Sequence, residues 1–429
     1  MTLLRAFAAV RAPSRSVLRS YSTAHTASSS SSLGSWAKLA VGLSAASVAA
    51  VYLYDSRAWV HRGILMPTIH FLLDAETAHR AAILAAKYHL CPVDRGVDSD
   101  VLATEIWGKK ISNPIGLAAG FDKHAEAIDA MFGVGFGAVE IGSVTPQPQP
   151  GNPLPRMFRL PEDRAVINRY GFNSEGHQAV YDRLKSRIRN FLYRSASGSE
   201  SLPKSLKENR LLGVNLGKNK TSPADSDDDY IKGIEKLGEF ADYIVVNISS
   251  PNTPGLRALQ RREPMERLMQ EVKDSRDKLS HRPPVVVKIA PDLTDEELDD
   301  IAQVVMKVGI DGVIISNTTI SRPATLKSDP RLIREMGGLS GPPIHSLSVA
   351  TLSKFYKITG GSVPLIGCGG VLTGEDVIRF AKAGASLVQL YSSMAYEGPG
   401  LIADLKDEVT RILNRENKTW NDIVGLDHK

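Results

Sequence analysis

Several short apolar runs in this sequence carry polar residues that could meet a ligand. Asn215 lies in LLGVNLG, Asn247 in YIVVNIS and Lys288 in VVVKIAP. A buried amide or ammonium group without a partner costs about 1–3 kcal/mol, so a polar ligand would satisfy these groups. Amide side chains offer donors and an acceptor, which suits the alternating C=O and N–H groups of a pyrimidine edge, and Lys123 could pair with a carboxylate. In the alternative interpretation, the asparagines only cap turns and strand ends.

A glycine-rich run, GCGG at 367–370, resembles the phosphate cradle at the ends of the last two strands of many barrels. Its backbone can approach an anion closely, and the helix expected after Thr373 and Gly374 could aim N–H groups at it. Together with an apolar cleft and Lys288 this suits FMN, because a lysine near N1 and C2=O of a flavin stabilises the reduced ring. A tight turn without a ligand is the competing interpretation. No GxGxxG fingerprint occurs in an early βαβ unit, so a nicotinamide nucleotide is not inferred.

The elements that must position these residues follow from a repeating pattern. Runs apolar on both faces, separated by helical stretches, indicate a parallel sheet, and eight such units favour a closed (β/α)8 barrel of the α/β class with its site at the C-terminal strand ends. The segment after the second run is too rich in Pro and Asn for a helix, so we expect an excursion over the barrel top. The charged stretch 194–210 is expected to be a solvated insertion. The eight runs are 114–120, 138–143, 211–217, 243–249, 285–291, 312–318, 364–370 and 387–393.

The segments that precede the eight runs predict three further parts of the protein. Residues 1–32 are rich in Arg, Ser and Ala and lack acids, as in a mitochondrial transit peptide, with a generic tail as the alternative. Residues 36–54 are mostly apolar and predict a single transmembrane helix, with a buried or peripheral helix as the alternative. Residues 58–92 predict an amphipathic helical segment, N-capped by Asp74, that either packs on the main domain or forms a lipid-facing entrance. The barrel is expected over 100–415.

Composition excludes several classes of protein. Hydrophobic residues amount to 42% and charged residues to 23%, as in ordinary globular domains. The formal net charge of +5 resides in residues 1–54, which contain five basic residues and no acid, so the remainder is neutral and offers no general nucleic-acid surface. Neither Cys91 nor Cys368 has a metal-ligand spacing, and two cysteines make no disulfide framework in 429 residues. We therefore expect no metal and no nucleic-acid partner.

Long, ordered motifs over about 60–400 closely resemble those of the class 2, membrane-associated and quinone-dependent dihydroorotate dehydrogenases. The resemblance implies oxidation of (S)-dihydroorotate to orotate in de novo UMP biosynthesis, with FMN as hydride acceptor and ubiquinone as electron acceptor. It also implies a mitochondrial inner-membrane location, with the barrel facing the intermembrane space. The motifs are AAGFDKHAEA (118–127), EIGSVTPQPQPGNPLPRMFRL (140–160), NRYGFNSEG (168–176), GVNLGKNK (213–220), VVNISSPNTPGLR (245–257), KIAPDLT (288–294), SNTTISRP (316–323), GGLSGPP (337–343), GCGG and QLYSS.

Carried over residue by residue, the resemblance implies three sets of binding residues. FMN would contact Ala119, Gly120, Phe121, Asp122, Lys123, Ser143, Asn215, Asn247, Lys288, Ser316, Gly341, Gly370, Tyr391 and Ser392. Dihydroorotate would be held by Lys123, Asn168, Arg169, Tyr170, Gly171, Phe172, Asn247, Asn252, Asn317 and Thr318. A quinone tunnel would be lined by Met66, Ile69, Ala78, His79, Ala82, Arg159 and Tyr391.

The resemblance also implies the catalytic base. Ser250, the second serine of NISSPN, matches it, although spacing alone does not choose between Ser249 and Ser250. The base would remove a proton from C5 while hydride leaves C6, and a serine hydroxyl needs a relay or water to accept that proton. Soluble class 1 members carry Cys at this place, so Ser250 favours class 2. Ser316 replaces the Thr of many members and keeps the hydroxyl.

Three other interpretations compete with this one. A soluble flavin barrel acting on a pyrimidine would lack 36–92 and favour Cys over Ser250. An inactive barrel serving as a membrane scaffold would not need polar strand ends, and a phosphate-ester lyase would have no use for Lys288 and so many asparagines. The expected partners are dihydroorotate and orotate, ubiquinone and inner-membrane lipid, with no obligate protein partner indicated.

Overall fold

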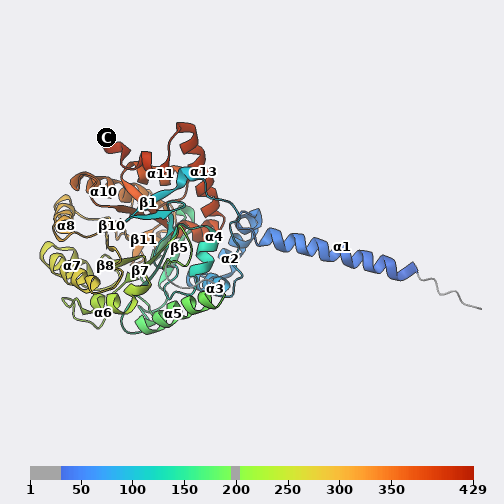
Figure 1. Ribbon diagram of the computed structural model, residues 1–429, viewed down its shortest axis with the longest axis horizontal. Coiled ribbons are helices and arrows are strands. Elements are labelled where there is room, and N and C mark those ends of the chain that lie inside the picture. Colours follow the sequence, from blue (N-terminus) through green and yellow to red (C-terminus); the bar gives the residue numbers. More distant parts are fainter. Residues whose placement is uncertain (1–29, 195–202) are drawn as a thin grey trace, which may run out of the picture. The chain divides into compact units, whose positions relative to one another are not determined.

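The computed structural model describes residues 30–194 and 203–429 (Figure 1). The chain divides into two compact units, Met1–Ala50 and Val51–Lys429, and each is described by itself. Most of the predicted transit peptide, 1–32, and part of the predicted insertion, 194–210, lie outside the described residues.

The segment expected to cross a membrane is helical. Helix α1 (Ser30–Leu53) contains almost all of 36–54, and the side chains of Trp36 and Val41 are exposed. Several other side chains of α1, among them Leu43, lie outside the described residues. Among the residues that the structure describes, no helix is both long and apolar enough to cross a membrane.

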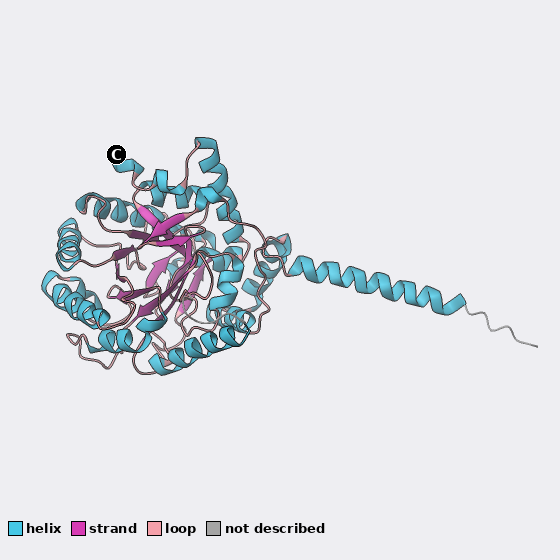
Figure 2. Ribbon diagram, in the orientation of Figure 1, coloured by secondary structure: helices cyan, strands magenta, loops and turns pink. Residues whose placement is uncertain are grey.

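All eight predicted runs form strands of a closed barrel. Within the described residues the order around the barrel is β10-β12-β13-β3-β4-β7-β8-β9, and neighbouring strands are parallel. The predicted (β/α)8 barrel is thereby confirmed, and parallel pairing brings the polar C-terminal strand ends to one mouth. Figure 2 shows these strands inside a ring of helices. The bounds are β3 (Ile115–Leu117), β4 (Ala138–Val144), β7 (Leu211–Leu216), β8 (Tyr243–Asn247), β9 (Val285–Ile289), β10 (Gly312–Ile315), β12 (Leu365–Cys368) and β13 (Ala385–Leu390).

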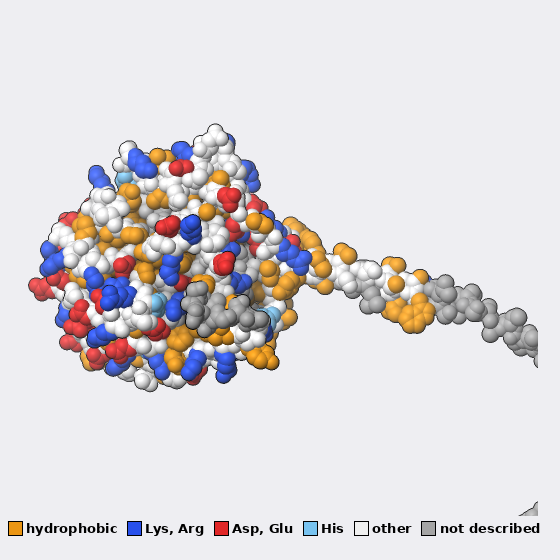
Figure 3. Space-filling view, in the orientation of Figure 1, with side chains coloured by type: hydrophobic (Ala, Val, Ile, Leu, Met, Phe, Trp, Pro, Cys, Tyr) orange, Lys and Arg blue, Asp and Glu red, His pale blue; other side chains and the backbone are white. Residues whose placement is uncertain are grey.

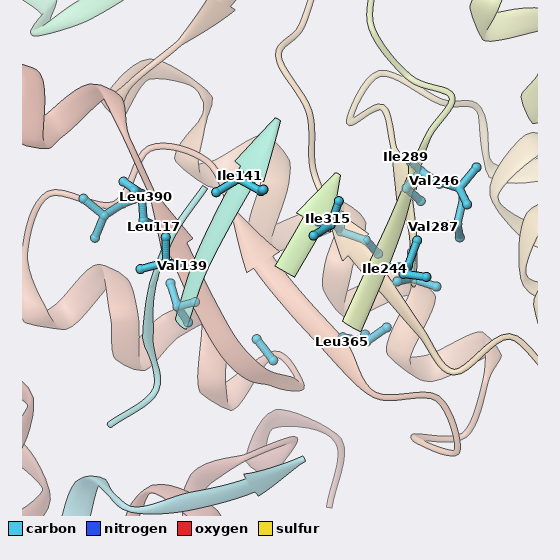
Figure 4. Close-up of a cluster of buried hydrophobic side chains, with 14 of the residues drawn as sticks. Leu117, Val139, Ile141, Ile244, Val246, Val287, Ile289, Ile315, Leu365 and Leu390 are labelled. Carbon is cyan, nitrogen blue, oxygen red and sulfur yellow. The ribbon is translucent and has the colours of Figure 1, made fainter. Parts of the chain in front are cut away.

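Helices cover the outside of the barrel because successive strand side chains alternate in direction. Val139 and Ile141 of β4 belong to the apolar layer between strands and helices, part of which Figure 4 shows, whereas Glu140 between them points into the barrel. The covering helices are α4 (Ile128–Val134), α5 (Gly176–Arg194), α6 (Asp228–Leu237), α7 (Arg262–Asp277), α8 (Asp295–Val308), α10 (His345–Ile358) and α11 (Gly374–Lys382), followed by α12 (Ser392–Glu397), α13 (Leu401–Glu416) and α14 (Trp420–Ile423).

A hairpin that the sequence analysis did not predict fills the N-terminal end of the barrel. Strands β1 (Thr104–Ile106) and β2 (Lys109–Ile111) pair antiparallel, and Ile106 and Ile111 pack in the same buried cluster as Tyr243. The Trp107 ring lies 5.3 Å from that of Tyr243. Strands of three residues are too short for periodicity to reveal them. This plug lies opposite the mouth that carries the polar strand ends.

The long connection after β4 runs over the C-terminal mouth, as predicted. Its strands β5 (Met157–Leu160) and β6 (Ala165–Asn168) form a three-stranded antiparallel sheet with β11 (Gly338–Ser340), in the order β11-β6-β5. Ile167 and Leu339 lie in a small core of this sheet. The sheet therefore has its own packing and can hold side chains over the barrel mouth.

The segment after α1 packs on the barrel and also exposes apolar surface. It comprises a short helical turn, His61–Leu65, then α2 (Met66–Leu72) and α3 (Ala75–Lys87). Asp74 caps α3 as predicted, because its Oδ1 accepts the N–H groups of Glu76 at 3.0 Å and Thr77 at 3.1 Å. Helix α3 contacts β5 and α4, whereas Phe71 and Leu72 are exposed. Helix α3 therefore packs on the main domain, and the lipid-facing entrance stays a prediction.

Candidate active site

A cavity at the C-terminal mouth of the barrel collects most of the residues expected to bind ligands. It holds about 1200 Å³ of space not filled by protein atoms, part of it open to solvent. Strand ends form its floor, and the β11-β6-β5 sheet and its loops form a further wall. The predicted residues that line it are Ala119, Gly120, Lys123, Ser143, Asn168, Tyr170, Gly171, Phe172, Asn247, Ser250, Asn252, Lys288, Ser316, Asn317, Thr318, Gly341, Gly370, Tyr391 and Ser392.

Hydrogen bonds join the amides of neighbouring strand ends. Asn317 Nδ2 donates to Asn247 Oδ1 at 3.2 Å, and Asn247 Nδ2 donates to Ser143 Oγ at 3.0 Å. The Ser143 hydroxyl in turn donates to Asn215 Oδ1. Asn215 does not line the cavity and lies one layer deeper in the barrel. These amides therefore form a connected network and do more than cap turns, although Asn247 Oδ1 also accepts the backbone N–H of Ser249 at 3.3 Å.

Lys288 places a buried ammonium group at the cavity wall. The residue is 5% exposed, and its Nζ makes no hydrogen bond or ion pair within the described part of the chain. Burying an unpaired cation is costly, so a ligand with an electron-rich or anionic edge would stabilise it. This matches the expected contact between Lys288 and a flavin.

Lys123 also lines the cavity, and its ammonium group contacts two neighbouring side chains. Its Nζ donates to Asn173 Oδ1 at 2.8 Å and lies 3.1 Å from the centre of the Tyr170 ring. Burial, and to a smaller extent the positive charge of Arg156, lowers the pKa of Lys123 to about 7. A ligand carboxylate at this place would favour the charged form.

The structure distinguishes Ser250 from Ser249, which their spacing in the sequence could not do. Ser250 lines the cavity, and its Oγ accepts the N–H of Asn252 at 3.3 Å. The Ser249 hydroxyl is engaged below, because it donates to Asn247 Oδ1 at 3.3 Å and accepts from Asn317 Nδ2 at 3.0 Å. Ser250 is therefore the serine that can meet a ligand.

A glycine loop offers free backbone donors at the strand ends expected to hold phosphate. Gly370 has φ +74°, and a Cβ there would lie 2.7 Å from the backbone nitrogen of His345. The N–H groups of Gly341, Gly370 and Val371 make no hydrogen bond within the described residues, although these residues line the cavity. An anion held by backbone N–H groups fits this loop.

Helix α11 does not share this role, so that expectation was wrong. Most N–H groups at its start already have partners: Asp376 Oδ2 accepts from Leu372 and Thr373, and the Thr373 hydroxyl accepts from Asp376. Glu408 accepts from Gly374 at 2.6 Å. A capping box thus occupies the helix end that an anion would need.

His79 links helix α3 to the cavity wall. Its Nε2 donates to the carbonyl of Phe121 at 2.7 Å, and its ring lies 5.8 Å from the Tyr391 ring. Burial, and to a smaller extent the charge of Lys123, lowers the pKa of His79 to about 3, so the ring is neutral at physiological pH. The Tyr391 hydroxyl is buried without a partner in the described residues. Tyr391 therefore faces both the cavity and the α2–α3 segment.

The other residues expected in a quinone tunnel lie where α2 and α3 meet β5. Arg159 of β5 donates to the carbonyls of Leu73 at 2.8 Å and Asp74 at 3.3 Å, in the turn between the helices. Ala78 lies one turn from Ala82 on α3. The cavity lining includes Tyr391 but none of Met66, Ile69, Ala78, His79, Ala82 and Arg159, so the tunnel set stays a prediction.

Three more residues expected to contact a ligand have side chains that do not line the cavity. The Asp122 carboxylate accepts the N–H groups of Glu126 and Ala127 at 2.8 Å each, and burial raises the pKa of Asp122 to about 6. Arg169 forms an ion pair with Glu335. Phe121 reaches the site through its carbonyl to His79, and its ring does not line the cavity. Asp122 thus fixes the loop that leads into α4, and its side chain does not meet the cavity.

Sequence reasoning missed several residues that line the cavity. Asn173 is the partner of Lys123, and its presence in the motif NRYGFNSEG was the available signal. Met157 and Val166 of the sheet above the barrel, and Ile344 in the turn after β11, form an apolar part of the wall. No local pattern points to these three, because only the fold of the β11-β6-β5 sheet turns them toward the strand ends.

Comparisons with known proteins agree on one family. The family profile described as "Dihydroorotate dehydrogenase" matches residues 101–413. The chain is 49% identical over 415 residues to the mitochondrial dihydroorotate dehydrogenase (quinone) of Lachancea kluyveri, covering 93% of each. It is 49% identical over 368 residues to the protein of that name from Mus musculus, covering 85% of this chain and 90% of the mouse protein. The crystal structure of DHODH from Eimeria tenella in complex with ferulenol has a TM-score of 0.77 at 41% identity, covering 83% of this chain and 96% of that one.

Proposed function

Because this chain belongs to the dihydroorotate dehydrogenase family, we propose that its barrel oxidises (S)-dihydroorotate to orotate and passes the electrons to a quinone. The reaction is a step of pyrimidine biosynthesis, and the chain is a mitochondrial flavoenzyme like the relatives that it resembles. Its motifs and Ser250 favour class 2 of the family.

The observation that supports this function best is the grouping of Lys123, Asn247, Asn317 and Ser250 around one cavity. Dihydroorotate has an imide edge and a carboxylate. Amide side chains complement the imide, and a lysine complements the carboxylate. Ser250 stands on the same wall, so proton removal and substrate recognition can occur together.

FMN is the flavin that the cavity suits. The free N–H groups of Gly341, Gly370 and Val371 would hold its phosphate, and the unpaired ammonium of Lys288 would lie at its ring. When bound, FMN supplies the hydride acceptor and the outlet for electrons to the quinone. Ser143, Ser316 and Ser392 add hydroxyl groups to the same lining.

Ser250 is the proposed base that takes the proton from C5 of dihydroorotate while its own hydroxyl proton passes to a water molecule. Its hydroxyl accepts a backbone N–H from Asn252, which fixes the position of Oγ. Asn247, Asn317 and Lys123 hold the ring so that C5 faces this oxygen, and such positioning supplies a large part of the rate. The apolar wall that includes Met157 and Val166 limits water around the reacting carbon.

Electrons leave toward the α2–α3 segment. His79 and Tyr391 stand between the cavity and this segment, and the neutral ring of His79 avoids a buried charge near an apolar quinone. Phe71 is 88% and Leu72 67% exposed on α2, and hydrophobic side chains gather on this part of the surface (Figure 3). A lipid-soluble quinone would therefore enter here from inner-membrane lipid.

Attachment to the mitochondrial inner membrane completes the proposal. The apolar sequence 36–54 would tether the enzyme as a single-pass segment, and the barrel would face the intermembrane space. Extraction of mitochondria with alkaline carbonate, with and without residues 36–54, tests the tether, and protease protection in mitoplasts tests the orientation.

Anaerobic flavin reduction tests the chemistry. Dihydroorotate should bleach the flavin of the purified enzyme, and a ubiquinone analogue should restore the colour. Ser250→Ala should slow bleaching about 10²- to 10⁴-fold, the usual contribution of a general base. Ser249→Ala is the matched control, since its hydroxyl serves the amides and its loss should weaken binding more than the saturated rate. A colourless protein, or one that stays yellow with dihydroorotate, would contradict the assignment.

A further inference from the structure

An arginine contacts the loop that carries the proposed base. Arg257 is the last residue of the motif VVNISSPNTPGLR, and the mechanism above gives it no role. Its Nε donates to the carbonyl of Ser249 at 3.2 Å, and its Nη2 donates to the carbonyl of Thr318 at 3.1 Å. Its Nη1 forms an ion pair with Asp292 Oδ1 at 3.0 Å. One side chain therefore joins the loops that follow β8, β9 and β10.

The peptide group between Ser249 and Ser250 depends on this contact. Within the described residues, the carbonyl of Ser249 has Arg257 as its one hydrogen-bond partner, and the N–H of Ser250 in the same peptide group has none. Because a peptide group is planar, the direction of its carbonyl also sets the direction in which the chain enters Ser250. Arg257 thus provides the hydrogen bond that fixes this peptide group.

The other hydrogen bonds of the two serines do not replace this one. The N–H and the hydroxyl of Ser249 both bond to Asn247 Oδ1 at 3.3 Å, but these groups precede the peptide group and do not fix its rotation. Ser250 Oγ accepts from the N–H of Asn252 at 3.3 Å, and this donor lies two residues further along the same loop. It would move together with Ser250, so it does not orient Ser250 relative to the barrel.

The guanidinium group of Arg257 is itself held in place. Asp292, its ion-pair partner, accepts at Oδ2 from the Thr319 hydroxyl at 2.9 Å and from the N–H of Ile320 at 3.2 Å. A guanidinium group is planar, always charged and carries its donors in a fixed fork, so acceptors on three loops determine its position. The carbonyl of Ser249 therefore meets a donor whose place is set by the loops after β9 and β10.

We propose that Arg257 is a positioning residue for the base: by holding the carbonyl of Ser249 it fixes the peptide plane before Ser250 and directs the Ser250 hydroxyl toward the substrate. This rests on the proposed function, because it concerns proton removal by Ser250 in that reaction. Arg257 does not line the cavity, so it acts on the reaction through Ser250 and not by contact with the substrate.

The test is the rate of flavin reduction at saturating dihydroorotate, measured anaerobically by stopped flow. Arg257→Met removes the three hydrogen bonds and should slow reduction about 10- to 100-fold, because a displacement of a reacting group by about 1 Å has an effect of this size. Orotate binding, measured by calorimetry, should stay within about threefold of wild type, since the hydrogen bond between the amides of Asn247 and Asn317 does not involve Arg257.

Two further variants separate positioning of the base from general damage to the structure. In a Ser250→Ala background there is no hydroxyl to position, so Arg257→Met should slow the remaining reduction by less than about twofold. General damage would slow reduction equally in both backgrounds. Arg257→Lys keeps the charge and can still pair with Asp292, but an ammonium group lacks the fork that reaches all three acceptors. This variant should melt at the wild-type temperature and still reduce flavin more slowly than wild type.

Arg262→Met is the matched control, because Arg262 is exposed and pairs with Asp300 on the surface. It should leave the rate within about twofold of wild type, as expected for the loss of a surface ion pair. A wild-type rate in Arg257→Met or Arg257→Lys, equal slowing in the Ser250→Ala background, or a loss of orotate affinity as large as the loss of rate would each overturn the inference. If dihydroorotate does not reduce the flavin of the wild type, the proposed function fails instead.

Discussion

Lys123 gives the sharpest pH prediction for this enzyme. Burial holds its pKa at about 7 in the cavity, and an incoming carboxylate binds the charged form. Orotate binding should therefore be constant below about pH 7. Above that pH, affinity should fall about tenfold per pH unit, because each unit leaves about a tenth of the lysine charged.

Two aromatic neighbours of Lys123 do not titrate where the affinity should fall, and the pKa of the adjacent Asp122, about 6, lies below that range. Burial lowers the pKa of His79 to about 3 and raises that of Tyr170 far above neutrality. Binding at pH 8 should thus take up close to one proton from the buffer. Calorimetry of orotate binding in two buffers of different ionisation enthalpy, from about pH 6 to 8.5, measures both the affinity and the proton uptake.

Two substitutions at Lys123 separate charge from fit. Lys123→Met removes a charge-assisted hydrogen bond, usually about 1.5–3 kcal/mol, so binding at pH 6 should weaken about 10- to 150-fold and lose its pH dependence. Lys123→Arg stays charged throughout and should give a flat profile. A wild-type affinity that is constant over the same pH range would refute the reasoning.

Three further predictions concern other parts of the barrel. Lys288→Met should lower the flavin reduction potential by about 30–60 mV, equivalent to about 1.4–3 kcal/mol for two electrons, as measured by spectroelectrochemical titration. Gly370→Ala should lose FMN during purification, visible in the ratio of flavin to protein absorbance, because its Cβ would collide with the start of α10. Lys406→Met should lower the free energy of unfolding by about 1.5–3 kcal/mol in denaturant titrations, since it removes the ammonium 2.7 and 2.6 Å from the buried carboxylates of Asp94 and Asp98, each of which keeps an arginine partner.

The local sequence pattern was sufficient to predict the barrel, because the hydrophobic periodicity of a strand or helix appears in residues that are close in sequence. Runs such as 243–249 and 285–291 are apolar on both faces, and a parallel strand covered by helices requires that. The hairpin 104–111 was not predicted, because each of its strands has only three residues and is too short to show a hydrophobic periodicity.

The expectation for helix α11 failed for a different reason. The sequence shows that Thr373 precedes a helix, but the same residues can either cap that helix or leave its N–H groups for an anion. Asp376 and Glu408 settle the matter by accepting those N–H groups, and Glu408 comes from α13, far along the chain. Only tertiary packing brings that carboxylate to the helix end.

By itself the sequence determined the eight strands, the polar residues at their ends and, through its motifs, the family. Those features depend on residue type and short-range spacing. The tertiary structure alone decided that Ser250 faces the cavity while Ser249 is bonded beneath it, and that Asn173 holds Lys123. Each of these rests on the direction of a side chain relative to groups on other strands or loops, and direction is fixed only when the barrel closes.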